Sequence, residues 1–328
     1  MRKLWFLIKW SPVLAMIAAV AGYMFIQNHA KARGPLQGEK TFIVNKGMSF
    51  RQITAKLADE NIIPNRYLFK AYVVLNNKEA MFKAGEYLFE PGTSPRDVVA
   101  LLADGKAVSR NVTIPEGLLT EDILKRVAKA PYLKGDVPHD VGEGELLPET
   151  YAYLRGDSRA KIVNIMRKGM TKTLNELWEK REAGLPLKSK REALILASIV
   201  EKETGVGAER SQVAGVFINR LNRGMKLQTD PTVIYGMYKQ NGKYDRTIRK
   251  SHLANKNPYN TYIIDGLPPT PIANPGRAAI EAVLNPNEHD YLYFVATGGG
   301  GHHFSKTYAE HERYVAKYRA WERAQKAN

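Results

Sequence analysis

An uncharged apolar run lies near the N-terminus, ahead of segments in which apolar residues recur with the short periods of helices and strands. It extends from Trp10 to Ile26, a little short of the ~20 residues that a membrane span needs. No small-residue cleavage site follows it, because Tyr23 and Phe25 occupy that zone. We therefore expect residues 1–27 to form a short N-terminal tip and an uncleaved transmembrane anchor, in preference to a cleaved signal peptide or a buried helix.

Positive charge does not orient this anchor, because basic residues flank the apolar run almost equally. They are Arg2, Lys3 and Lys9 before it and Lys31, Arg33 and Lys40 after it. Charge alone therefore leaves open the side of the membrane on which the body lies. The polar residues 28–40 are expected to form a linker.

A pattern of β-prone residues, a glycine turn, a Ser or Thr and a helical apolar stripe then recurs over residues 42–57, 87–102 and, more loosely, 112–127. The Ser or Thr residues suit helix N-caps. They are Ser49, Ser94 and Thr120. The pattern predicts strand–turn–helix repeats over residues 41–135. The first copy resembles a LysM module, a small glycan-binding fold, and an ordinary α+β spacer domain fits it equally well.

Residues 136–144 are rich in Pro, Gly and acidic side chains and mark a domain boundary. Beyond them the pattern predicts a mixed α+β domain over 136–328. Its expected elements are helices over 160–181, 189–204 and 211–222, a strand over 291–296 and a last helix from about Ser305. The helix over 189–204 has Ser189 as N-cap and Glu192 in the position of a capping box. The four glycines Gly298–Gly301 suit a hairpin turn.

Composition excludes several kinds of site and favours one kind of partner. The chain has 328 residues, 49 Lys+Arg, 33 Asp+Glu, a net charge of +16 and no cysteine. The absence of cysteine excludes disulfides, thiolate zinc sites, iron–sulfur clusters and a cysteine nucleophile. The basic charge favours an anionic partner: nucleic acid, a lipid surface or an acidic polymer such as a cell-wall glycan. Nucleic acid is supported by charge alone, without a recognised motif or a dense basic stripe, and is not expected.

No cofactor site is expected either. His302 and His303 follow the glycine run, but no spaced histidine or carboxylate partners of a metal motif accompany them. The glycine run also lacks the Gly-Lys-Ser/Thr ending of a phosphate-binding loop.

Two glutamates lie at the C-terminal end of the apolar helix over 189–204. Glu203 shares a face with Leu196, Ile199 and Val200, whereas Glu201 falls on a less apolar face. Burial disfavours a carboxylate, so the pKa of Glu203 should rise and leave it a proton to donate near neutral pH. Both carboxylates could instead be solvated at the helix end.

Amides, hydroxyls and aromatic rings are concentrated in segments 217–221, 227–236, 258–262 and 266–276. Such side chains line sugar-binding grooves, because aromatic faces stack on pyranose rings and amides bind hydroxyl and N-acetyl groups. Loops of this composition can equally pack on themselves, and Asn219 and Arg220 could be a buried structural pair.

The motifs in these segments resemble, in order, those of the YceG-like family of endolytic murein transglycosylases. They are Ala197-Ser-Ile-Val-Glu-Lys-Glu-Thr, Val216-Phe-Ile-Asn-Arg-Leu, Leu227-Gln-Thr-Asp-Pro-Thr-Val-Ile-Tyr-Gly, Tyr259-Asn-Thr-Tyr, Gly266-Leu-Pro-Pro, and Tyr291-Leu-Tyr-Phe-Val-Ala followed by His302-His-Phe. The resemblance implies a single-pass protein of the bacterial inner membrane with a cytoplasmic N-terminal tip, a periplasmic body, a LysM-like region and a C-terminal catalytic domain. It implies Glu203 as the essential glutamate, with Glu201 as the fallback, and aligns His302 with the family histidine despite the extra glycines.

The implied reaction cleaves the β-1,4 bond between N-acetylmuramic acid and N-acetylglucosamine without water and leaves 1,6-anhydromuramyl ends. One carboxylate suffices for it, unlike in two-carboxylate hydrolases. The expected partners are glycan strands of peptidoglycan, the inner membrane and cell-wall synthases. The expected substrate-binding residues are Asn219, Gln228, Thr229, Asp230, Tyr235, Tyr259, Asn260, Tyr262 and His302.

Two alternatives stay open. In a muramidase a second carboxylate, for which Asp230 is the nearest candidate, would activate water. A membrane-tethered glycan-binding scaffold would have no catalysis at all.

Overall fold

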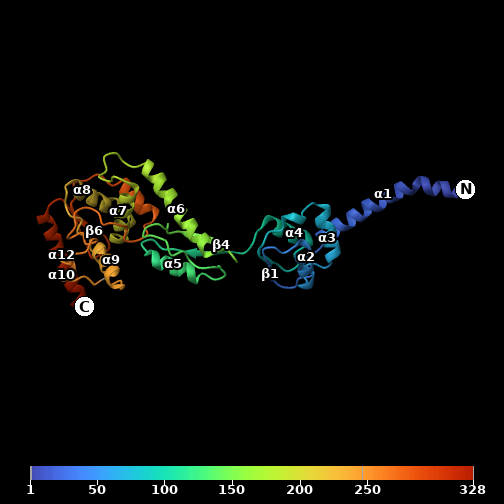
Figure 1. Ribbon diagram of the computed structural model, residues 1–328, viewed down its shortest axis with the longest axis horizontal. Helices are drawn as coiled ribbons and strands as arrows, with labels where there is room; N and C mark the ends of the chain where they lie inside the picture. Colours follow the sequence, from blue (N-terminus) through green and yellow to red (C-terminus); the bar gives the residue numbers. More distant parts are fainter. Residues whose placement is uncertain (1, 246, 328) are drawn as a thin grey trace. The chain divides into compact units, whose positions relative to one another are not determined.

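The computed structural model describes residues 2–245 and 247–327, with side-chain surroundings for residues 10–245 and 247–325. It is a mixed α+β structure with two compact units (Figure 1). The first unit comprises the residues up to Arg110 together with Ala152–Asp157, and the second comprises Asn111–Tyr151 and the residues from Ser158 onward. The α+β class predicted from the sequence is confirmed.

The first unit begins with one long helix, α1 (Arg2–Lys31). Its stretch Trp10–Lys31, with a mean hydropathy of 1.5, is long and apolar enough to cross a membrane. A signal sequence near an N-terminus would have the same length and composition. The helix continues past residue 27, so the first residues of the predicted linker are helical. Ala30 is only 3% exposed and packs in the core of this unit, beside α3 and α4.

The remainder of the first unit is a small sheet with helices. Strands β1 (Lys40–Val44) and β2 (Gly85–Phe89) pair antiparallel, with Phe42 opposite Tyr87. The helices are α2 (Phe50–Asp59), α3 (Arg66–Leu75), the 3₁₀ turn η1 (Glu79–Met81) and α4 (Pro95–Asp104). The rings of Phe42, Phe89 and Phe69 fill the core between them, because β-prone and helical apolar stripes converge there.

All three predicted strand–turn–helix segments form: β1 leads to α2, β2 to α4, and β3 (Ser109–Thr113) to α5 (Thr120–Lys129). Ser49 caps α2 with a complete capping box, and Ser94 caps α4. The predicted cap at Thr120 is wrong, because Leu119 is the N-cap and Thr120 is already helical. The Thr120 hydroxyl instead bonds to the carboxylate of Glu143, 3.0 Å away. The resemblance to a LysM module stays a prediction.

Strands β3 and β4 (Thr150–Leu154) pair as a two-stranded sheet, and the chain passes between the two units along them. The sequence-based domain boundaries stay predictions; the compact units divide the chain after Arg110, earlier than residue 136.

The second unit is mainly helical and is built around one buried helix, α7 (Lys190–Glu203), which packs against α6, α8, α9 and α11. Every residue from Ile195 to Val200 is buried. The other elements, several of which are labelled in Figure 1, are α6 (Arg159–Glu179), η2 (Gly207–Glu209), α8 (Arg210–Asn222), α9 (Asp230–Asn241), α10 (Lys250–Leu253), α11 (Arg277–Leu284), β5 (Tyr293–Ala296), β6 (His302–Ser305) and α12 (Tyr308–Ala327).

The predicted elements of this unit are confirmed to within a few residues, with two corrections of detail. The backbone of Glu192 donates to the Ser189 hydroxyl, but the Glu192 carboxylate accepts from the backbone of Lys188, so the predicted capping box is half formed. The last helix starts at Tyr308 because Ser305 still belongs to β6. The glycine run does form the turn of an antiparallel hairpin between β5 and β6, as predicted.

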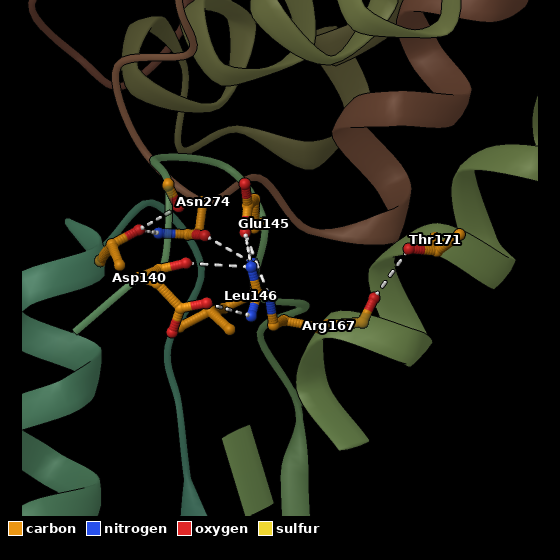
Figure 2. A network of polar contacts seen from close by, with 8 residues as sticks. Asp140, Glu145, Leu146, Arg167, Thr171 and Asn274 are labelled. Carbon is orange, nitrogen blue, oxygen red and sulfur yellow. Dashed lines mark hydrogen bonds and ion pairs between the residues drawn. The ribbon is translucent and has the colours of Figure 1, made fainter. Parts of the chain in front are cut away.

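A buried asparagine connects the loop before α11 with the segments around α5. Asn274 is 0% exposed, and its Oδ1 accepts from the Leu146 amide at 2.9 Å. Its Nδ2 donates to the Thr120 hydroxyl at 2.9 Å and to the Glu143 carboxylate at 3.0 Å. Figure 2 shows Asn274 over Leu146, with the ion pair between Arg167 and Glu145 beside it. This side chain therefore fixes the loop before α11, which contacts the end of α7 through Gly276 and Glu201.

Replacing Asn274 by alanine should lower the free energy of unfolding by about 1–3 kcal/mol, because it leaves the buried backbone amide of Leu146 without its partner and removes one hydrogen bond to the Glu143 carboxylate. Urea unfolding of the full chain, followed by tryptophan fluorescence, measures the change. Asn222→Ala, at an exposed position at the end of α8, is the matched control and should change stability little. Equal stability of the two variants would show that the Asn274 network contributes nothing.

Candidate active site

Glu203, the last residue of α7, lies in a pocket of about 310 Å³. The pocket walls come from the end of α7, from α8, from the segment that leads into α9, from the loop after α10, from β5 and from α12. The lining residues are Glu203, Phe217, Arg220, Leu227, Gln228, Asp230, Tyr262, Tyr293, Phe294, Tyr308 and His311. A carboxyl group thus faces a polar and aromatic cavity at the end of a fully packed helix.

Burial raises the pKa of Glu203 to about 7, and the nearby charge of Asp230 acts in the same direction. A hydrogen bond from the Thr229 hydroxyl to Glu203 Oε1 and the charge of Arg220 oppose this rise. The direction agrees with the helix periodicity, which places Glu203 with the apolar residues. At neutral pH the group therefore exists in both protonation states, as a group that donates and reclaims a proton must.

Thr229 is held in place by hydrogen bonds that involve Thr261. Its backbone amide donates to the Thr261 hydroxyl at 3.0 Å, and that hydroxyl also lies 2.8 Å from the Thr232 hydroxyl. The neighbouring Gln228 has a left-handed backbone, with φ of 49°. Its backbone amide donates to the Thr261 carbonyl at 3.1 Å. A non-glycine residue in this region costs free energy and occurs often at functional sites. Gln228 lies on the pocket wall and Thr229 just behind Glu203.

The charges around the pocket are also fixed. Tyr262 donates its hydroxyl proton to Asp230 Oδ1 at 2.7 Å. Arg220 is 8% exposed, and its guanidinium donates to the carbonyls of Leu292 at 2.7 Å and Leu227 at 2.8 Å. It also lies over the ring of Tyr293, 5.1 Å from the centroid. Arg220 therefore connects α8 with two walls of the pocket and supplies a positive charge near Glu203.

Glu201, the fallback candidate, has a different environment. Its Oε2 accepts from the backbone amide of Gly276 at 2.9 Å, and its Oε1 lies 3.7 Å from Arg210 Nη2. Burial raises its pKa as well, but it does not line the pocket. Because both of its oxygens have protein partners, Glu201 positions the loop before α11, and the geometry favours Glu203 as the reacting group.

The other residues expected from the sequence divide into two groups. Gln228, Asp230 and Tyr262 line the pocket, and Thr229 bonds to Glu203. The remainder do not line it. Asn219 donates to the carbonyls of His289 at 2.6 Å and Tyr291 at 3.0 Å.

Asn260 is 1% exposed and donates to backbone carbonyls, that of Asn255 at 2.8 Å among them. Tyr259 and Tyr235 pack edge to face with ring centroids 5.0 Å apart. His302 lies in β6 and contacts Glu209, with Nδ1 2.8 Å from Oε2. The contacts of these side chains lie within the second unit and hold its loops and elements together. Their expected roles in substrate binding stay predictions.

Sequence reasoning missed the contribution of α12 and most of β5. Tyr293 and Phe294 lie within the motif Tyr291-Leu-Tyr-Phe-Val-Ala, but the motif alone does not mark them as pocket residues. Tyr308 and His311 belong to the last helix, whose sequence is charged and carries no motif that points to a site. The His311 ring stacks on that of Tyr293, with centroids 5.3 Å apart and planes at 25°. Burial, followed by the charge of Arg220, lowers the pKa of His311.

No group of three or more His, Asp or Glu side chains placed to hold a metal ion occurs in the parts of the chain that the structure describes. The chemistry that the pocket offers is proton transfer by a carboxyl group of raised pKa, beside a second carboxylate fixed by Tyr262 and several aromatic rings. That combination suits acid–base chemistry of the kind used on glycosidic bonds.

Comparison with known proteins identifies the family. Residues 42–317 match the YceG-like family, and the chain belongs to it. A protein of Bacillus subtilis strain 168 named endolytic murein transglycosylase is 34% identical, over 84% of this chain and 71% of its own length. A protein of the same name from Streptococcus pneumoniae D39 is 27% identical, over 95% of this chain and 65% of its own length. The 2.6 Å crystal structure of a YceG-like protein from Listeria monocytogenes is 33% identical in sequence, with a TM-score of 0.52 over 84% of this chain and 98% of that one.

Glu203→Gln should stabilise the protein at pH 8 by about 3 kcal/mol and leave stability nearly unchanged near pH 4. The folded-state pKa lies above the unfolded value of 4.5, so the protonated group favours folding and this contribution is lost as pH rises through about 7. Urea unfolding at both pH values measures the effect. Glu281→Gln, at an exposed carboxyl on α11, is the control. A Glu203→Gln variant no more stable than wild type at pH 8 would rule out a buried, costly carboxylate.

Proposed function

We propose that this chain is an endolytic lytic transglycosylase that cleaves the β-1,4 bond between N-acetylmuramic acid and N-acetylglucosamine in peptidoglycan, leaving 1,6-anhydromuramyl ends. The observation that carries the proposal is Glu203, a carboxyl group with a pKa of about 7 at the wall of a polar and aromatic pocket. The shared name of the relatives supports both the enzyme class and the substrate.

In the first step Glu203 gives its proton to the glycosidic O4, and the bond between C1 and O4 breaks. The carboxylate then takes the proton of the muramyl C6 hydroxyl, whose oxygen attacks C1. The enzyme recovers its proton and no water enters. The Thr229 hydroxyl donates to Glu203 and can keep the carboxyl oriented in both protonation states. The charge of Asp230, fixed by Tyr262, would stabilise the oxocarbenium-like transition state.

A muramidase is the second candidate, and one observation favours it. Asp230 lines the same pocket as Glu203, so a second carboxylate is available to activate water. The mass of the products separates the two reactions, because anhydro ends lack one water. A glycan-binding scaffold without catalysis would release no product.

The membrane topology belongs to the proposal as well. The apolar helix α1 would anchor the protein as a single-pass protein of the bacterial inner membrane, with its body in the periplasm where peptidoglycan lies. The burial of Ala30 in the core supports a direct connection between this helix and the first unit. We further propose that the first unit is a LysM-like glycan-binding region and that the enzyme acts on nascent strands beside cell-wall synthases.

Glu203→Gln should lower glycan cleavage by at least about 100-fold, the contribution typical of one acid–base group. The amide keeps the shape of the side chain but cannot transfer the proton. The assay uses the full chain in detergent with purified glycan strands and mass analysis of the products. Glu201→Gln is the matched control and should lose far less activity.

Three outcomes would contradict the proposal in different ways. Near-normal turnover by Glu203→Gln with an inactive Glu201→Gln would identify the other glutamate as the acid. Reducing ends that carry an added water would indicate the muramidase. No product from the wild-type chain would support the scaffold.

A further inference from the structure

A second cavity, of about 300 Å³, lies between the start of α12 and the β5–β6 hairpin. We name it the cationic groove and define it by three basic and three aromatic side chains: Lys306, Arg313, Lys317, Tyr291, Phe304 and Tyr314. None of these residues lines the pocket of Glu203. The reaction steps derived above use none of them.

The groove adjoins the Glu203 pocket because the same elements build both. Helix α12 gives His311 to the pocket and Tyr314, about one turn further along the same side of the helix, to the groove. In the hairpin, Phe294 of the pocket lies opposite Phe304 of the groove, with ring centroids 6.1 Å apart. A strand bound at Glu203 therefore has the cationic groove beside it.

The charge in the groove is available to a ligand. Its one acidic residue, Glu310, accepts hydrogen bonds from the backbone amides of Lys306 and Thr307 and so serves the start of α12. Lys306 pairs with Asp290 at 2.9 Å. Among the described residues, neither Arg313 nor Lys317 has a carboxylate within ion-pair distance.

The aromatic side of the groove is ordered by stacking. The ring of Tyr314 lies on that of His303, with centroids 4.3 Å apart and planes at 17°. Lys317 Nζ lies 5.3 Å from the Tyr314 centroid on the same helix. The rings of Tyr291 and Phe304, in one groove with the cations of Arg313 and Lys317, suit a ligand that has both aliphatic groups and anionic oxygens.

We propose that the cationic groove binds the carboxylates of the stem peptides that muramyl residues carry, so that the enzyme prefers strands with peptides attached. This rests on the proposed function. The sugar backbone of such a strand is neutral, and its peptides provide carboxylates together with small aliphatic side chains. Anionic oxygens could also come from a pyrophosphate at a lipid-linked strand end, which the experiment separates.

The test compares Arg313→Gln/Lys317→Gln with the wild-type full chain in detergent on three substrates. They are glycan strands with stem peptides, the same strands stripped of them with the freed lactyl carboxyls capped as amides, and such stripped strands that end in a lipid pyrophosphate. The double variant should lose about tenfold in kcat/KM on peptide-bearing strands, as expected for two charge-assisted contacts, and less than about twofold on stripped strands. Arg319→Gln/Arg323→Gln, on the same helix outside the groove, is the matched control and should change neither value.

Equal losses on peptide-bearing and stripped strands, or no loss on either, would overturn the proposal. A loss confined to strands that end in a lipid pyrophosphate would assign the groove to phosphate instead and would also overturn it. Affinity is measured in parallel in the Glu203→Gln background, where peptide-bearing strands should bind more tightly than stripped ones only if the groove is intact. If the wild-type chain cleaves nothing, the proposed function fails, while these affinities still decide the role of the groove.

Discussion

The burial of one carboxyl group at the end of α7 is the constraint on which the site depends. Leu196, Ile199 and Val200 are fully buried, and the same helical face continues to Glu203. Packing the helix therefore brings an ionisable group to the border of the core, where its charged form is disfavoured. The core that stabilises the second unit is thus also what gives Glu203 a pKa of about 7.

The loops around α7 are held by the same helix. Ser198 accepts from the Ile272 amide at 2.9 Å, and Glu201 accepts from the Gly276 amide at 2.9 Å. Asn274, between these two positions, carries the connection onward to α5. Two buried polar groups of α7 thus fix one long loop, and Thr261 fixes the segment of Thr229. The flexibility expected of loops rich in Pro, Gly and Asn is removed by hydrogen bonds to buried side chains.

Much of this arrangement could be predicted from the sequence, because helix periodicity is local. It located α7, separated the faces of Glu203 and Glu201 and gave the direction of the pKa shift. The ordered motifs also selected Gln228, Asp230 and Tyr262. Periodicity could not place α12 in the site, because Tyr308 and His311 reach the pocket only through packing on the hairpin, about a hundred residues after Glu203.

For Asn219, Asn260 and His302 the difficulty is the reverse: the sequence predicts binding residues that do not line the pocket. Each has a side chain suited to binding sugars, and each is bonded to protein groups in the structure: backbone carbonyls for the two asparagines and Glu209 for the histidine. A sequence shows which polar groups are present but not which of them the fold uses for itself.

The most direct test of Glu203 as the proton donor is the titration of its carboxyl by carbon-detected NMR in the full chain, with the signal assigned by its loss in Glu203→Gln. A buried Glu203 should titrate with a midpoint near 7. A midpoint near 4.5, the ordinary value, would show that the carboxyl is ionised at neutral pH and would contradict its role as the proton donor.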